Sequence, residues 1–172
     1  MMKIAGAILV IGATSLMGAA KAGDIRGQYT QLLRLQRLIC SLQGEMRYAR
    51  SHLGEIFEAI GRQEEEPYRS WLLGLGREMG KRQKGTFAGI WAESIEDSLG
   101  DSRLPSKEIE RLKALGSQLG CADLKLQLCT IDLYLEQLAG TIGEAREEMK
   151  TKVRLCHCLG VMSGMFVAVL LL

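Results

Sequence analysis

The residues with the strongest chemical potential in this chain are its histidines and cysteines, and their spacing argues against a site. Cys156, His157 and Cys158 are consecutive, and both residue types are common zinc ligands. Neighbouring side chains on a helix point about 100° apart, so these three cannot converge on one ion without ligands from elsewhere. The only other histidine is His52. We therefore predict no metal site.

Catalytic and cofactor motifs are missing as well. None of the 20 glycines belongs to a GxxxxGK[ST] or GxGxxG pattern after a strand, so the chain has no such phosphate-binding loop and is not expected to hydrolyse nucleotide itself. Glu93, Glu96 and Asp97 fall on the surface of a predicted helix, and nothing marks a buried acid and base among them. We predict no catalytic residue, no cofactor and no enzymatic activity.

Two uncharged segments lie at the ends of the chain. Ile4–Ala20 and Leu155–Leu172 contain no Asp, Glu, Lys or Arg. Each could cross a hydrocarbon layer as a helix of roughly 17 to 25 residues. The sequence thus predicts an N-terminal transmembrane helix over residues 1–22 and a C-terminal one over residues 155–172.

Positive charges at the inner edges of these segments predict their orientation. Lys21 follows the first segment, and Lys150, Lys152 and Arg154 precede the second. By the positive-inside rule, residues 23–154 then form a domain in the cytoplasm. The net charge of the chain is only +2, which argues against a nucleic-acid binder. The five cysteines are an odd number and suit a reducing compartment.

Two further patterns concern the membrane segments. Gly160 and Gly164 match the GxxxG spacing that lets membrane helices approach closely, either to the first segment or to a partner. The alternative for the N-terminus is a cleaved signal peptide, because Ala20-Lys21-Ala22 has the small-x-small form of a cleavage site. The protein would then be a secreted or surface-anchored helical module.

Between its ends the chain shows the period of helices rather than strands, and we predict an all-α bundle of about six helices. Pro67 and Pro105 are expected to open helices, and Ser51 and Thr86 to cap them. The last helix carries the longest apolar stripe, with Leu126 and Leu133 widening it. Residues expected to face the core are Leu32, Leu35, Ile39, Leu42, Met46, Leu53, Ile56, Phe57, Ile60, Phe87, Ile90, Trp91, Ile95, Leu124, Leu128, Ile131, Leu135, Leu138, Ile142, Ala145 and Met149.

A sharp corner is predicted before the last helix. Gly120 can end one helix in a left-handed conformation, and Asp123 can cap the next. Such a corner explains why these residue types occur at Gly116, Leu119, Gly120 and Asp123. It explains Gln127 less well, so either a polar contact or a partner surface remains open for that residue.

The same segment, Gly116–Gln127, resembles the GxxLGxxDxxxQ signature of the stage III sporulation protein AB family of endospore-forming bacteria. Leu42, Glu45, Met46 and Tyr48 are similar to that family's early L-x-x-E-[IM]-x-Y stretch. One departure is that Ser51-His52-Leu53 stands where the family commonly has Thr-Pro-Leu.

The resemblance implies a function. It indicates a non-enzymatic membrane platform in the secretion-like complex that links mother cell and forespore, with its helical domain in the mother-cell cytoplasm. That domain would be similar to those of type II secretion and type IV pilus platform proteins. Expected partners are the complex's secretion-type ATPase, its other subunits and the membrane. Glu45, Tyr48 and the corner residues from Gly116 to Gln127 are the expected signature or partner-contact residues.

Overall fold

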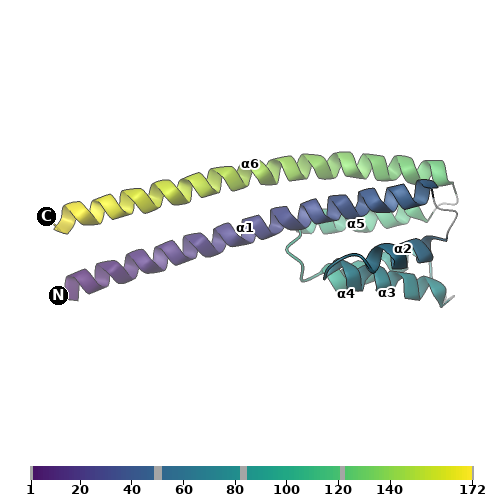
Figure 1. The fold of residues 1–172 in the computed structure, drawn as a ribbon, viewed down its shortest axis with the longest axis horizontal. Helices are drawn as coiled ribbons and strands as arrows, with labels where there is room; N and C mark the ends of the chain where they lie inside the picture. The colour runs from purple at the N-terminus through teal and green to yellow at the C-terminus, as the bar shows by residue number, and fades with distance from the viewer. Residues whose placement is uncertain (1, 49–51, 82–84, 121–122, 172) are drawn as a thin grey trace. The chain divides into compact units, whose positions relative to one another are not determined.

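The computed structural model is all-α, as the sequence predicts. It describes the backbone of residues 2–48, 52–81, 85–120 and 123–171, and side chains within 23–48, 52–81, 85–120, 123–152 and at 155. Over these residues the chain forms six helices and no strand (Figure 1). They are α1 (Met2–Tyr48), α2 (Leu53–Gly61), α3 (Tyr68–Gly80), α4 (Phe87–Leu99), α5 (Ser106–Leu119) and α6 (Leu124–Leu171).

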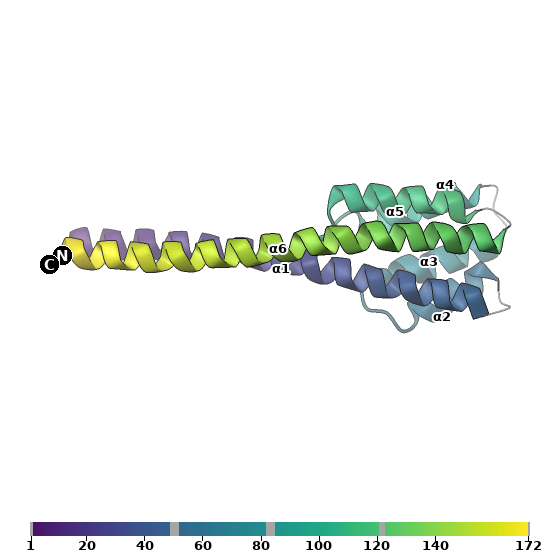
Figure 2. The same ribbon diagram turned by 90° about the horizontal axis from the view of Figure 1, so that it is seen from above.

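The chain divides into two compact units. One comprises Gln31–Thr141, and the other combines the terminal segments Met1–Thr30 and Ile142–Leu172. In the first unit the C-terminal part of α1 runs beside the N-terminal part of α6 (Figures 1 and 2), and α2 to α5 lie on one side of α1 in Figure 1. Gln43 Nε2 donates a hydrogen bond to Asp132 Oδ1 at 2.5 Å, which joins α1 to α6.

The apolar stripe predicted on α1 is confirmed. Its members are buried because the helical repeat places them on one face, which packs against the other helices. They are Leu32, Leu35, Ile39, Leu42 and Met46, joined by Leu38. α1 is also held to α3, since the Tyr68 hydroxyl donates to the Gln31 carbonyl at 3.1 Å.

The centre of this unit is an aromatic cluster. The rings of Trp71 and Trp91 meet edge to face, with centroids 5.1 Å apart and planes at 71°. Phe57 from α2 and Phe87 from α4 lie 5.8 Å and 5.7 Å from Trp91. Such offset and tilted pairs are the arrangements that aromatic rings prefer.

Most predicted helix starts are confirmed. Thr86 caps α4, with its Oγ1 accepting a hydrogen bond from the Gly89 amide at 3.3 Å. Pro67 and Pro105 immediately precede α3 and α5. The prediction for α2 was wrong: its N-cap is His52, which makes no side-chain capping bond, and Ser51 lies outside the described residues. α2 depends instead on burial of Ile56, Phe57 and Ile60.

The buried face of α6 is narrower than predicted. Ile131 and Leu138 are buried, but Leu126 and Leu133, which were predicted to widen the stripe, are 51% and 56% exposed, so that widening was wrong. Leu124, at the first turn, is also exposed. The buried face includes Tyr134, which is polar at its tip and was missed. Because α6 is covered on one side only, residues beyond that arc face solvent.

None of the helices, over the residues that the structure describes, is both long and apolar enough to cross a membrane. The structure does not describe the side chains of residues 1–22 and 156–172. The predicted membrane-packing pair, Gly160 and Gly164, and the Cys156-His157-Cys158 run therefore lie outside the described side chains.

Candidate partner-contact site

Gly116 is the first of the signature residues and is buried in α5. A Cβ atom added there would lie 2.1 Å from Trp91 Cδ1 and 2.3 Å from Cγ, which is far inside any permitted contact. The indole of Trp91 lies against this position and donates from Nε1 to the Leu112 carbonyl at 2.7 Å. Gly116 is therefore required for the close approach of α4 and α5.

Gly120 does not have the predicted left-handed conformation. It is the C-cap of α5 with φ −70° and ψ −5°, and no described glycine has positive φ. A left-handed residue commonly serves to satisfy the last carbonyls of a helix. Here the backbone of Gly120 is right-handed, and a side chain from α6 donates to the last carbonyl of α5. Phe87 atoms stand 3.5 Å from an added Cβ, an ordinary contact distance.

The side chain that caps α5 belongs to Gln127. Its Nε2 donates to the Leu119 carbonyl at 2.6 Å, and the residue is only 7% exposed. Leu119 itself is buried. Of the two roles left open for Gln127, this bond is the polar contact, and the burial leaves little of its side chain for a partner.

Asp123 caps α6 as predicted. Its Oδ1 accepts a hydrogen bond from the Lys125 amide at 2.9 Å, and its carbonyl accepts one from the Gln127 amide at 3.0 Å. A carboxylate at a helix N-terminus also interacts favourably with the helix dipole. Asp123 and Gln127 thus satisfy opposite ends of two successive helices.

Glu45 and Tyr48 have the opposite environment. Both are exposed on the last turns of α1, and Tyr48 is 83% exposed. A tyrosine ring is a large apolar group, and such rings are enriched in protein interfaces. Leu126 and Leu133 on α6 are exposed as well. We call Glu45 and Tyr48 the outer surface.

Comparisons with known proteins show the family of this chain. The sequence model of the family described as stage III sporulation protein AB matches residues 3–172. The chain belongs to this family. It is 24% identical to stage III sporulation protein AB of Bacillus subtilis (strain 168) over 172 residues, covering 100% of both chains. Family membership associates the chain with sporulation.

A solved structure shows the same fold. The structure of a stage III sporulation protein AB matches with a TM-score of 0.66 at 22% identity. The match covers 72% of this chain and 97% of that one. The helical fold of the family is therefore shared by this chain.

Within the family signature, the residues separate by burial. Gly116, Leu119 and Gln127 are buried and hold α4, α5 and α6 together, whereas Glu45 and Tyr48 are exposed. The sequence does not show which signature residues are buried, because both groups are recognised only by the spacing of residue types. Contacts within the fold account for the first group and for the exposed cap Asp123, whereas Glu45 and Tyr48 are exposed to solvent.

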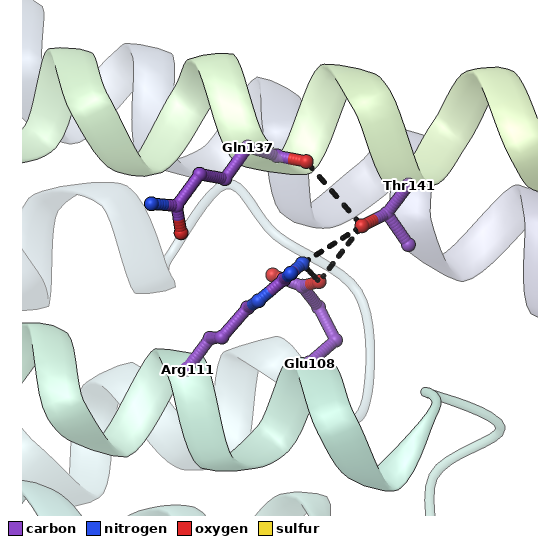
Figure 3. A network of polar contacts seen from close by, with 4 residues as sticks. All are labelled: Glu108, Arg111, Gln137 and Thr141. Carbon is purple, nitrogen blue, oxygen red and sulfur yellow. Dashed lines mark hydrogen bonds and ion pairs between the residues drawn. The ribbon is translucent and has the colours of Figure 1, made fainter.

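The sequence interpretation missed a buried polar cluster between α5 and α6. Glu108 is fully buried, and its Oε2 contacts Arg111 Nη1 at 3.2 Å and Thr141 Oγ1 at 3.4 Å (Figure 3). Arg111 also donates to Thr141 at 3.0 Å, and Thr141 to the Gln137 carbonyl at 3.3 Å. A charged residue on the apolar stripe of α5 was the available signal.

Two buried tyrosines have raised pKa values, and one of them, Tyr134, lies beside this cluster. Burial, and secondarily the Glu108 carboxylate, raises the pKa of Tyr134 far above its ordinary value. Burial also raises the pKa of Tyr68, with Arg34 opposing the shift. Both phenols therefore stay neutral at physiological pH and act as structural groups.

The described residues contain no group of three or more His, Cys, Asp or Glu side chains able to hold a metal ion. Cys40 and Cys129 are exposed free thiols on α1 and α6. In this part of the chain, the polar groups that are brought together serve caps and helix contacts.

Proposed function

We propose that this chain is a non-enzymatic membrane platform of the secretion-like complex that links mother cell and forespore during sporulation. In this proposal residues 1–22 and 155–172 are transmembrane helices, and residues 23–154 form the domain in the mother-cell cytoplasm. The domain contacts a secretion-type sporulation ATPase and couples it to other subunits of the stage III complex. Its localisation is the mother-cell membrane that surrounds the forespore.

One observation supports the platform role above the others. Tyr48, a signature residue, is 83% exposed, while the signature residues Leu119 and Gln127 are 1% and 7% exposed. Leaving an aromatic ring in water gives up the favourable free energy of burying it, so the fold does not explain its position. Contact with a partner would cover the ring.

The surroundings of Tyr48 fit a protein contact. Glu45 lies one turn before it on α1 and is exposed, which supplies a polar rim. An apolar centre with a polar edge is the usual composition of a protein interface.

The uncharged ends support the membrane part of the proposal. Ile4–Ala20 and Leu155–Leu172 contain no Asp, Glu, Lys or Arg, and Lys21 and Lys150 border the middle of the chain. Gly160 and Gly164 provide a small-residue face for packing on another membrane helix.

The ATPase contact is tested by co-purification from sporulating cells, with and without the ATPase. Tyr48→Ser and Glu45→Lys should accumulate normally, because both residues are exposed, yet lose ATPase association and spore formation. Glu136→Lys changes an exposed carboxylate of α6 outside the outer surface and should change neither. Normal association of both Tyr48→Ser and Glu45→Lys would reject the outer surface as the contact.

Topology is tested separately with reporter fusions. A periplasmic-type reporter after Leu172 should be active, and a cytoplasmic reporter inserted near Glu65 should also be active. The alternative of a secreted module predicts a mature N-terminus near Gly23, which mass spectrometry would detect. Finding that N-terminus, or the opposite reporter pattern, would replace the platform proposal.

A further inference from the structure

A groove of about 600 Å³ lies between α3 and α4 and is separate from the outer surface. Trp71 and Ser94 line it, and the Trp71 indole donates to Ser94 Oγ at 3.1 Å. Charged side chains from both helices line its edges. Small-molecule pockets are mostly enclosed and apolar, so this lining suits a macromolecular segment better.

Gly74 lines the groove on the α3 side and has no side chain to fill it. It lies within α3, where glycine destabilises a helix relative to alanine. A Cβ added at Gly74 would meet no atom within 4 Å, whereas one added at Gly76 would lie 2.7 Å from Glu58 Cγ. Packing inside the chain therefore explains Gly76 but not Gly74. Gly74 therefore leaves open space in this wall of the groove.

The α4 wall carries negative charge that the domain leaves uncompensated. Glu93 and Asp97 are exposed, line the groove and lie four residues apart. Like charges at this spacing repel each other on a helix. Within the described parts of the chain, neither forms an ion pair or hydrogen bond. A cationic partner would relieve this repulsion.

The α3 wall differs in charge. Lys81 forms an ion pair with Glu78 of its own helix at 2.6 Å, and Arg77 Nε donates to the Leu73 carbonyl at 3.1 Å. Lys81, the C-cap of α3, and Arg77 make these contacts on their own side of the groove, and no described ion pair crosses it to Glu93 or Asp97. The two carboxylates on the α4 side are thus left without a described cationic partner.

We propose that the α3–α4 groove is a docking site for an α-helix of a partner protein that carries two basic residues four positions apart beside small side chains. Residues four apart on a helix are separated by about 6 Å along the axis, so such a pair matches Glu93 and Asp97. Small side chains on that helix allow close approach at Gly74. α3 and α4 have 13 residues each, which gives a contact of about 20 Å.

The test uses the purified full chain in mild detergent and a fluorescein-labelled, alanine-rich peptide with lysines at two positions four apart. The peptide is about 18 residues long, because shorter isolated helices are marginal in water. A reference peptide carries glutamates in place of the lysines. Fluorescence anisotropy should show binding of the lysine peptide, weakened by salt, and at least roughly tenfold weaker binding of the reference.

Matched variants locate the binding. Gly74→Leu should lower the affinity at least roughly tenfold. Gly140→Leu places the same side chain on α6, where an added Cβ also meets nothing within 4 Å, and should leave binding unchanged. Glu93→Gln with Asp97→Asn should weaken binding as Gly74→Leu does, whereas Glu136→Gln with Glu144→Gln should not.

Circular dichroism of each variant separates lost binding from lost folding, and the charge pair keeps the test decisive if Gly74→Leu unfolds. The proposal is overturned if the lysine peptide does not bind, if both peptides bind equally, or if the control variants lose binding equally. Dissociation of a homo-oligomer by the groove variants, measured by sedimentation, would assign the groove to a second copy instead. The test does not use the ATPase or Tyr48, so its outcome is independent of the proposed function.

Discussion

Single residues at the α5–α6 corner are specified by partners far away in the sequence. Gly116 is the clearest case, because Trp91 occupies the space that a side chain at this position would need. Gly116→Ala should lower the free energy of unfolding by about 1 to 3 kcal/mol through overpacking, despite the better helix propensity of alanine. Urea denaturation followed by circular dichroism measures this change.

The control for that substitution is Gly140→Ala. Nothing lies within 4 Å of a Cβ at Gly140, so only the propensity gain remains and the variant should be slightly more stable. Equal effects of the two substitutions would mean that Trp91 does not limit the residue at Gly116.

Gln127 is also a structural residue in this fold. Gln127→Ala leaves the Leu119 carbonyl without its side-chain donor, which should cost about 1 to 3 kcal/mol because the group is buried. Gln137→Ala changes an exposed glutamine of the same helix and should cost less than about 0.5 kcal/mol. Thermal melts of the two variants compare them directly, and a Gln127→Ala melt like that of the parent would remove the capping role.

At the scale of helices, α6 shows how far a periodic pattern predicts burial. Leu138→Ala should cost about 2 to 5 kcal/mol, because Leu138 is fully buried. Leu133→Ala, in the same helix but 56% exposed, should change stability by less than about 0.5 kcal/mol. Both values come from chemical denaturation of the full chain. A large loss from Leu133→Ala would place that side chain in an intramolecular contact.

At the scale of the whole molecule, the buried tyrosines make stability depend on alkaline pH. The folded state keeps Tyr68 and Tyr134 protonated, because their pKa values are raised, while the unfolded state releases these protons near pH 10, the ordinary value. The unfolded state then binds fewer protons, so stability should fall as pH rises above about 10.

Urea midpoints measured between pH 8 and about 11 test this dependence. Tyr134→Phe should flatten the alkaline decline, because it removes one of the shifted groups. Tyr48→Phe, at an 83% exposed position, should leave the decline unchanged. An unchanged slope in Tyr134→Phe would show that this phenol does not control the transition.

The sequence by itself determined the helical class, the stripe of α1, and the caps at Thr86 and Asp123. These features depend on neighbours within one or two turns, which a linear pattern contains. The signature from Gly116 to Gln127 likewise identified the family, because a spacing of residue types can be recognised without knowing what it builds.

Only the tertiary structure showed why the signature residues are needed and which side chains are exposed to solvent. Gly116 depends on Trp91, Gln127 on the Leu119 carbonyl, and Glu108 on Thr141, and each pair joins different helices. The exposure of Leu133 depends on how much of α6 its neighbours cover. Helix periodicity gives the direction of a side chain, but the distance of closest approach between two helices decides what it meets.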